Sequence, residues 1–113
     1  MTVLFFAGVI SDSTAEITKS PENVIVLPNQ DAILNCSTDN IDNIRWTYDH
    51  NVISSPPCIA HDSGFIASSP DPAHDCDIVA PADEPHGISG SYVCADATDK
   101  AVAMVIQLSE LTE

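Results

Sequence analysis

The stretch Gly90-Ser91-Tyr92-Val93-Cys94, taken with the upstream Cys36 and Trp46, decides how we interpret this chain. Side chains alternate between the two faces of a strand, so Tyr92 and Cys94 share one face, as do Leu34 and Cys36 on an earlier strand. We expect Leu34, Trp46 and Tyr92 to form a core in which Trp46 covers a disulfide made by Cys36.

The remaining pattern predicts an all-β domain. Of the 113 residues, 44% are hydrophobic but only 5% are aromatic, so Val, Ile, Leu and Ala must build most of the core, and such a composition suits strands. Pro21 splits the first strand, which would let the chain change sheets. The predicted strands cover residues 15–18, 23–27, 32–36, 44–48, 91–96 and 100–108, with weaker candidates at 52–53, 64–67 and 78–79.

Four cysteines, Cys36, Cys58, Cys76 and Cys94, indicate a disulfide framework. The chain has no Cys-x-x-Cys pair, and spacings of 22, 18 and 18 residues suit bridges between strands better than a zinc knuckle. Three pairings are open at this point. Disulfides of this kind predict an oxidising, extracellular compartment.

The chain is strongly acidic. Seventeen Asp and Glu residues against Lys19, Arg45 and Lys100 give a formal net charge of -14. A polyanion would be repelled, so we expect no nucleic acid, heparin-like chain or anionic membrane surface as a partner. The charge either keeps the protein soluble or steers a basic protein partner towards it.

The motif residues resemble those of the immunoglobulin superfamily over about residues 17–108. The resemblance is carried by Leu34-x-Cys36, Trp46 and Gly90-x-Tyr92-x-Cys94. It implies a Greek-key sandwich of two antiparallel sheets, in which Cys36 pairs with Cys94 and the Tyr92 hydroxyl bonds nearby backbone. The 57 residues between these cysteines imply an I-set or C2-like domain.

The same resemblance leaves Cys58 to pair with Cys76, with pairing to another molecule as the alternative. Two departures from the family pattern stand out. Ile88 occupies the position, four residues before Tyr92, where the family often has Asp, and the last strand lacks the Gly-x-Gly bulge of antigen-receptor variable domains. Antibody-style recognition by paired variable domains is therefore not expected.

Candidate catalytic and metal-binding residues lack the spacing that their chemistry needs. His50, His61, His74 and His86 show no i, i+2 or i, i+4 pair that would direct two of them to one metal ion. Three aspartates that offer calcium ligands, Asp71, Asp75 and Asp77, do not follow the order of an EF-hand loop. Ser and His occur without a Gly-x-Ser-x-Gly motif. We predict no metal, no cofactor and no enzymatic activity.

Asn35-Cys36-Ser37 matches the acceptor sequence for N-glycosylation, which makes Asn35 a candidate glycosylation site. Asn35 should point outward while Cys36 points into the core. The central cysteine and the predicted strand both count against modification.

The apolar run from Val3 to Ile10 predicts a signal peptide, or the remnant of one, over residues 1–11, followed by an immunoglobulin-like domain over residues 12–113. No Lys or Arg precedes the run, so an apolar first strand is the alternative. No apolar segment is long enough to cross a bilayer, and a membrane link would need a segment absent from this chain.

We expect a secreted or cell-surface module that binds another protein, as part of a receptor or an adhesion protein. Self-association through the apolar strand at residues 100–108 is one form of this function. A secreted immune effector that binds a microbial or cationic ligand is the first alternative. A structural spacer within a larger ectodomain is the second. Fold analogy carries most of this step, because this family hosts many binding roles.

Overall fold

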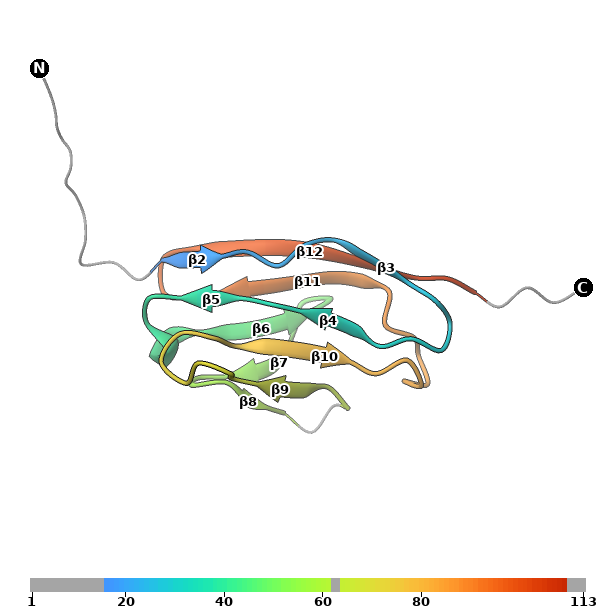
Figure 1. Cartoon of the computed structure of the whole chain (residues 1–113), viewed down its shortest axis with the longest axis horizontal. Helices are drawn as coiled ribbons and strands as arrows, with labels where there is room; N and C mark the ends of the chain where they lie inside the picture. Colours follow the sequence, from blue (N-terminus) through green and yellow to red (C-terminus); the bar gives the residue numbers. More distant parts are fainter. Residues whose placement is uncertain (1–15, 62–63, 110–113) are drawn as a thin grey trace, which may run out of the picture.

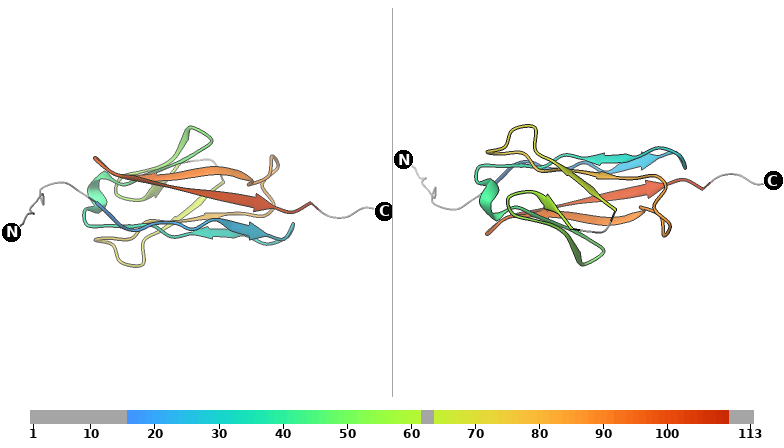
Figure 2. Two further views of the ribbon diagram at one scale, coloured as in Figure 1. Left: turned by 90° about the horizontal axis from the view of Figure 1, so that it is seen from above. Right: turned by 90° about the horizontal axis from the view of Figure 1, so that it is seen from below.

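The computed structural model describes residues 16–61 and 64–109, which form two β-sheet layers packed face to face (Figure 1; edge on in Figure 2). The first layer holds a three-stranded sheet in the order β4-β10-β9, and a short pair, β2 and β5, continues it. Its strands are β2 (Ile17–Lys19), β4 (Ala32–Leu34), β5 (Ser37–Thr38), β9 (Ile66–Ser68) and β10 (Asp77–Ala80).

The second layer is a six-stranded sheet in the order β3-β12-β11-β6-β7-β8. The chain passes back and forth between the layers, and the all-β Greek-key sandwich that the sequence predicts is confirmed. The strands are β3 (Val24–Val26), β6 (Arg45–Tyr48), β7 (Asn51–Ser55), β8 (Ile59–Ala60), β11 (Gly90–Ala95) and β12 (Lys100–Gln107).

Pro21 lies between β2 and β3, at the point where the chain changes layer. β2 pairs with β5 in the first layer, whereas β3 pairs with β12 in the second. A proline has no N–H for a sheet ladder, so the first strand cannot continue unbroken through it. The β3–β12 pairing is parallel. The second sheet is therefore mixed, whereas we expected only antiparallel pairs.

The core centres on Trp46, which has no exposed surface and lies in register with Cys94. The indole Nε1 donates to the carbonyl of Cys76 at 2.9 Å, and the amide of Cys76 donates to the carbonyl of Cys36 at 2.8 Å. At the register shift after Trp46, the Trp46 amide instead donates to the hydroxyl of the buried Ser54. Backbone groups around the tryptophan are thus satisfied inside the core.

Several element boundaries differ from those that the sequence predicts. The strand expected at 32–36 ends at Leu34, because the amide of Cys36 donates to the Asp77 carboxylate instead of to a neighbouring strand. Asp49 and His50 form a two-residue hairpin turn with φ values of 53° and 74°. Such turns usually carry Asn-Gly or Asp-Gly, so the sequence pattern did not predict this turn. β7 is longer than expected, and β8 was not predicted.

The predicted leader, residues 1–11, and the residues up to Ala15 lie outside the part of the chain that the structure describes. Within residues 16–61 and 64–109, the only helical element is the 3-10 turn Ile41–Asn43, and no helix has the length and apolarity to span a membrane.

The Tyr92 hydroxyl donates to the backbone carbonyl of Ile88 at 2.7 Å, and both residues are completely buried. We call this hydrogen bond the Tyr92 corner. Its acceptor is a backbone oxygen, so it forms although Ile88 stands where the immunoglobulin family often has Asp. The ring of Tyr48 stacks on Tyr92 with a centroid distance of 4.5 Å. Gly90 permits this arrangement, since a Cβ there would lie 2.8 Å from Cε1 of Tyr48.

Burial raises the pKa of the Tyr92 phenol well above its usual value, and the neighbouring Tyr48 and Glu84 add to the shift. Above about pH 10 the unfolded chain loses this proton while the folded chain keeps it. We therefore expect the free energy of unfolding to fall as the pH rises above about 10, with a slope approaching about 1.4 kcal/mol per pH unit for one tyrosine. Urea denaturation between about pH 8 and 11 measures this slope.

The control for this pH dependence is Tyr92→Phe, which keeps the ring but has no proton to lose. It should be less stable than the wild type near neutral pH, because the Ile88 carbonyl loses its donor. Its stability should then depend less on alkaline pH. An unchanged slope in Tyr92→Phe would show that another group titrates.

Candidate protein-docking face

A row of side chains crosses the outer surface of the six-stranded sheet. Val102, Val93, Thr47 and Val52 lie in register on β12, β11, β6 and β7. They point away from the core, because side chains alternate along a strand and the residues between them on β12, β11 and β6 pack inward. Val102 is 54% exposed and Val52 is 43% exposed, so the row is open to solvent.

Three further apolar side chains widen this row along the β12 edge of the sheet. Met104 and Ile106 follow Val102 on the outer side of β12, and Ile25 on β3 lies in register with Ile106. Their exposed fractions are 44%, 49% and 64%. Large apolar side chains exposed singly are ordinary, whereas a contiguous set of them marks an interaction surface.

A basic row borders the apolar one. Lys100, Ala95 and Arg45 lie in register across β12, β11 and β6, on the same outer side as Val102. They bring together two of the three basic residues of the chain. We call these residues together the docking face: Ile25, Arg45, Thr47, Val52, Val93, Ala95, Lys100, Val102, Met104 and Ile106.

Acidic residues are excluded from this sheet. None of the six strands contains Asp or Glu, although the chain has 17. Among the described strands, only β10 carries one, Asp77; the other described carboxylates lie in loops and turns. A face without negative charge on a chain of net charge -14 is where an apolar or acidic surface meets the least repulsion.

The sequence predicted part of this surface. Apolar residues on both sides of the segment 100–108 indicate a strand that is partly covered on both faces, as at an interface. In the structure Ala103 and Val105 are buried, while the opposite side of β12 is exposed. Ile25, Val52 and Arg45 were missed, because only the pairing of distant strands places them beside β12.

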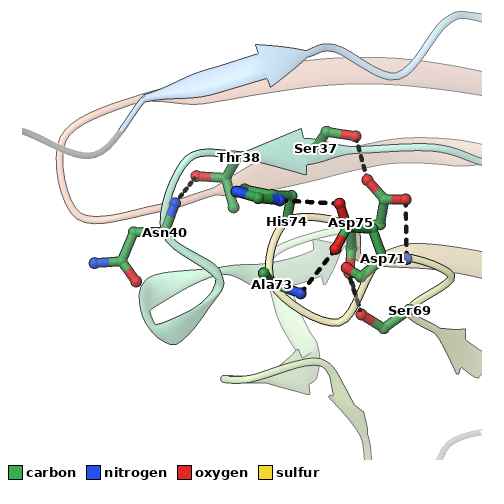
Figure 3. Close-up of polar contacts among 8 residues, drawn as sticks. All are labelled: Ser37, Thr38, Asn40, Ser69, Asp71, Ala73, His74 and Asp75. Carbon is green, nitrogen blue, oxygen red and sulfur yellow. Dashed lines mark hydrogen bonds and ion pairs between the residues drawn. The ribbon is translucent and has the colours of Figure 1, made fainter.

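Two of the three aspartates considered as calcium ligands, Asp71 and Asp75, lie in the loop before β10 (Figure 3), whereas Asp77 is the first residue of β10. Asp75 accepts from the Ser37 hydroxyl at 2.7 Å and from the amide of Asp71 at 3.2 Å. Asp71 accepts from the amide of Ala73 and contacts the His74 ring, with 2.9 Å between Oδ2 and Nδ1. The contact with His74, followed by the Ala73 amide, lowers the pKa of Asp71. These two carboxylates thus stabilise their own loop and tie it to β5.

Three of the four histidines lie in different loops or turns and have different surroundings. His61 bonds the Ser55 hydroxyl, His74 bonds Asp71, and His50 occupies the β6–β7 turn. In residues 16–61 and 64–109, no three His, Cys, Asp or Glu side chains are grouped so that they could hold a metal ion.

The disulfides join the pairs that the resemblance implied, Cys36 with Cys94 and Cys58 with Cys76, with Cα–Cα distances of 6.6 and 5.5 Å. The expected core residues Leu34, Trp46 and Tyr92 are fully buried. Asn35, the candidate glycosylation site, is half-buried and lies between Leu34 and the disulfide-bonded Cys36. It belongs to the first layer and not to the docking face.

No protein-family model and no curated protein matches the sequence. Solved structures do match. A chimeric titin Z1Z2-Z1Z2 tandem has a TM-score of 0.69 at 20% identity and is matched over 84% of this chain and 50% of its own. The two-domain DIP-gamma IG1+IG2 structure has a TM-score of 0.64 at 20% identity, over 82% and 48%.

A complex between titin and an Ig domain of obscurin-like 1 contributes a third match, with a TM-score of 0.67 at 19% identity, over 87% of this chain and 97% of that one. This chain spans about half the length of the titin tandem and of the DIP-gamma structure. Together with the sheet order, the buried Trp46 and the Tyr92 corner, these matches show that the chain has the fold of a single immunoglobulin domain.

Proposed function

We propose that this chain is an extracellular, non-catalytic module that binds another protein through the docking face, as part of a cell-surface receptor or an adhesion protein. One observation carries the proposal: the six-stranded sheet, which displays the larger set of contiguous exposed apolar side chains, has no carboxylate in its strands and holds Arg45 and Lys100. A matched structure in which titin is in complex with an obscurin-like 1 Ig domain supports a protein partner for this fold.

The extracellular location rests on the two disulfides, which persist in oxidising compartments and are rare in the cytosol. A leader over residues 1–11 would deliver the chain there and remains a prediction.

The size of the docking face sets the expected strength of binding. β12 has eight residues, which corresponds to about 27 Å, and the four strand spacings from β3 to β7 add up to about 19 Å. The other strands are shorter than β12, so the face covers at most about 500 Å² for each partner, no more than the lower limit of specific protein interfaces. A weak and reversible contact follows, of the kind that acts through many copies on opposing surfaces.

We propose a second copy of this chain as the partner. Copies with a net charge of -14 repel one another, and the strands of the docking face carry no carboxylate that would add to this repulsion at the contact. Raising the salt concentration should strengthen this association, because it screens the repulsion while leaving the apolar contact in place.

Analytical ultracentrifugation tests this proposal. We expect the wild type to self-associate at about 100 µM protein, and more strongly at about 0.5 M than at about 0.05 M NaCl. Val102→Asp should weaken the association more than about tenfold, because it places an unpaired charge in the contact. Ile33→Asp, which adds the same charge at a position of similar exposure (60%) on the other layer, is the matched control.

Each other outcome is informative. A wild type that stays monomeric at both salt concentrations contradicts self-association. Equal effects of Val102→Asp and Ile33→Asp contradict the docking face. Binding of a cationic ligand that weakens as salt rises, and that survives Val102→Asp, would support an immune effector acting through its acidic loops. A spacer would show no binding that depends on this face.

A further inference from the structure

A second row of exposed apolar side chains crosses the outer surface of the first layer. Ile33, Val79 and Ile66 lie in register on β4, β10 and β9. Ile33 is 60% exposed and Ile66 is 56% exposed. The two layers pack through their inner faces, so this row and the docking face lie on opposite sides of the sandwich (Figure 2). An exposed apolar row of this kind tends to bind other proteins unless something covers it.

Asn35 lies two positions after Ile33, on the same outward side of the chain. Its neighbours Leu34 and Cys36 are both buried, so the Asn35 side chain points away from the core. It borders an open hollow of about 260 Å³ that Ile33 and residues 19–24 also line. The side-chain hydrogen bonds described for residues 16–61 and 64–109 do not involve its amide.

Asn35-Cys36-Ser37 is the only Asn-x-Ser or Asn-x-Thr sequence in the chain. One objection to its use is removed, because the site is not inside a regular strand. β4 ends at Leu34 and β5 begins at Ser37. Between them, the amide of Cys36 donates a hydrogen bond to the Asp77 carboxylate. The acceptor sequence therefore occupies a break between two short strands.

We infer that Asn35 carries an N-linked glycan that covers the Ile33–Val79–Ile66 row. The amide nitrogen of Asn35 forms a bond to C1 of the first sugar, the bond from C1 to the pyrophosphate of a lipid-linked oligosaccharide donor breaks, and the amide loses one proton. The row extends over two strand spacings, about 10 Å, so the first sugars of the glycan reach across it. This inference rests on the extracellular location proposed above.

A glycan on this side would leave only the second layer available for protein binding. Bulky, hydrated sugar on the first layer excludes protein partners from the Ile33–Val79–Ile66 row. The docking face on the second layer stays open, because it lies on the opposite side of the sandwich.

The test is secretion of the full chain from cultured eukaryotic cells behind a cleavable secretion signal, followed by mass spectrometry. We expect the peptide containing Asn35 to carry hexosamine and hexose that a peptide N-glycosidase removes, converting Asn35 to Asp. Asn35→Gln and Ser37→Ala should both abolish the modification, whereas Ser37→Thr should retain it. Secreted wild type with unmodified Asn35 overturns the inference.

The variants separate glycosylation from folding. Ser37→Ala also removes the hydrogen bond to Asp75, whereas Asn35→Gln breaks none of the described side-chain hydrogen bonds, so a loss shared by both reports the glycan. The result is independent of the docking proposal, because an unmodified Asn35 would leave the contrast between Val102→Asp and Ile33→Asp intact.

Binding of a hydrophobic dye tests whether the glycan covers the Ile33–Val79–Ile66 row. Secreted Asn35→Gln should bind more of a hydrophobic fluorescent dye than the glycosylated wild type, and adding Ile33→Ser to Asn35→Gln should reverse the increase. Equal dye binding by glycosylated wild type and Asn35→Gln would show that the glycan does not cover the row.

Discussion

Trp46→Ala is expected to lower the free energy of unfolding by about 3–5 kcal/mol. Trp46 has no exposed surface, and truncation leaves a cavity at the centre of the sandwich. It also leaves the Cys76 carbonyl without the indole N–H that lies 2.9 Å from it. Whole domains of this size are stable by about 5–15 kcal/mol, so this variant should be close to the limit of folding.

Circular dichroism in increasing urea measures the effect, because Trp46 is the only tryptophan and its fluorescence is lost in the variant. Trp46→Phe keeps most of the ring but not the donor, and should cost less than Trp46→Ala. This second variant keeps the comparison possible if Trp46→Ala does not fold. A loss below about 1 kcal/mol for Trp46→Ala would contradict a central role for the side chain.

Removal of either disulfide is the second large effect that we expect. In the chain-entropy model, the sequence separation of 58 residues between Cys36 and Cys94 corresponds to about 4 kcal/mol. The separation of 18 residues between Cys58 and Cys76 corresponds to about 3 kcal/mol. We therefore expect the double variant Cys36→Ala/Cys94→Ala to lose more stability than Cys58→Ala/Cys76→Ala.

The structure changes what the smaller disulfide means. The segment that it closes, residues 58–76, contains only one weakly predicted strand, 64–67. In the structure Cys76 is fully buried, its amide donates to the Cys36 carbonyl, and its carbonyl accepts from Trp46. The second disulfide thus anchors the segment before β10 to the centre of the core.

Urea denaturation of the two double variants, both without free thiols at the altered positions, gives the comparison. A larger loss for Cys58→Ala/Cys76→Ala would mean that the contacts of Cys76 depend on its bond to Cys58 and outweigh the difference in loop length.

Short-range sequence patterns were sufficient to predict the fold. The two-residue period around Cys36 and Cys94 placed Leu34 and Tyr92 on inward faces, and Pro21 marked where the first strand divides. Such features depend on neighbours along the chain, so they can be read before the pairing of strands is known. The Asp49-His50 turn was not predicted, because neither residue is the glycine that usually occupies turn positions with positive φ.

Both proposed surfaces depend on pairing between distant strands. Lys100 and Arg45 become neighbours only because β12 and β6 flank β11, and Ile25 reaches Ile106 only through the parallel β3–β12 pair. Register is set by how all strands bury their inner faces together, so no local stretch encodes it. The chain's own order of residues thus specified an immunoglobulin fold and its core, while the docking face and the Ile33–Val79–Ile66 row arose from the packing of strands far apart in that order.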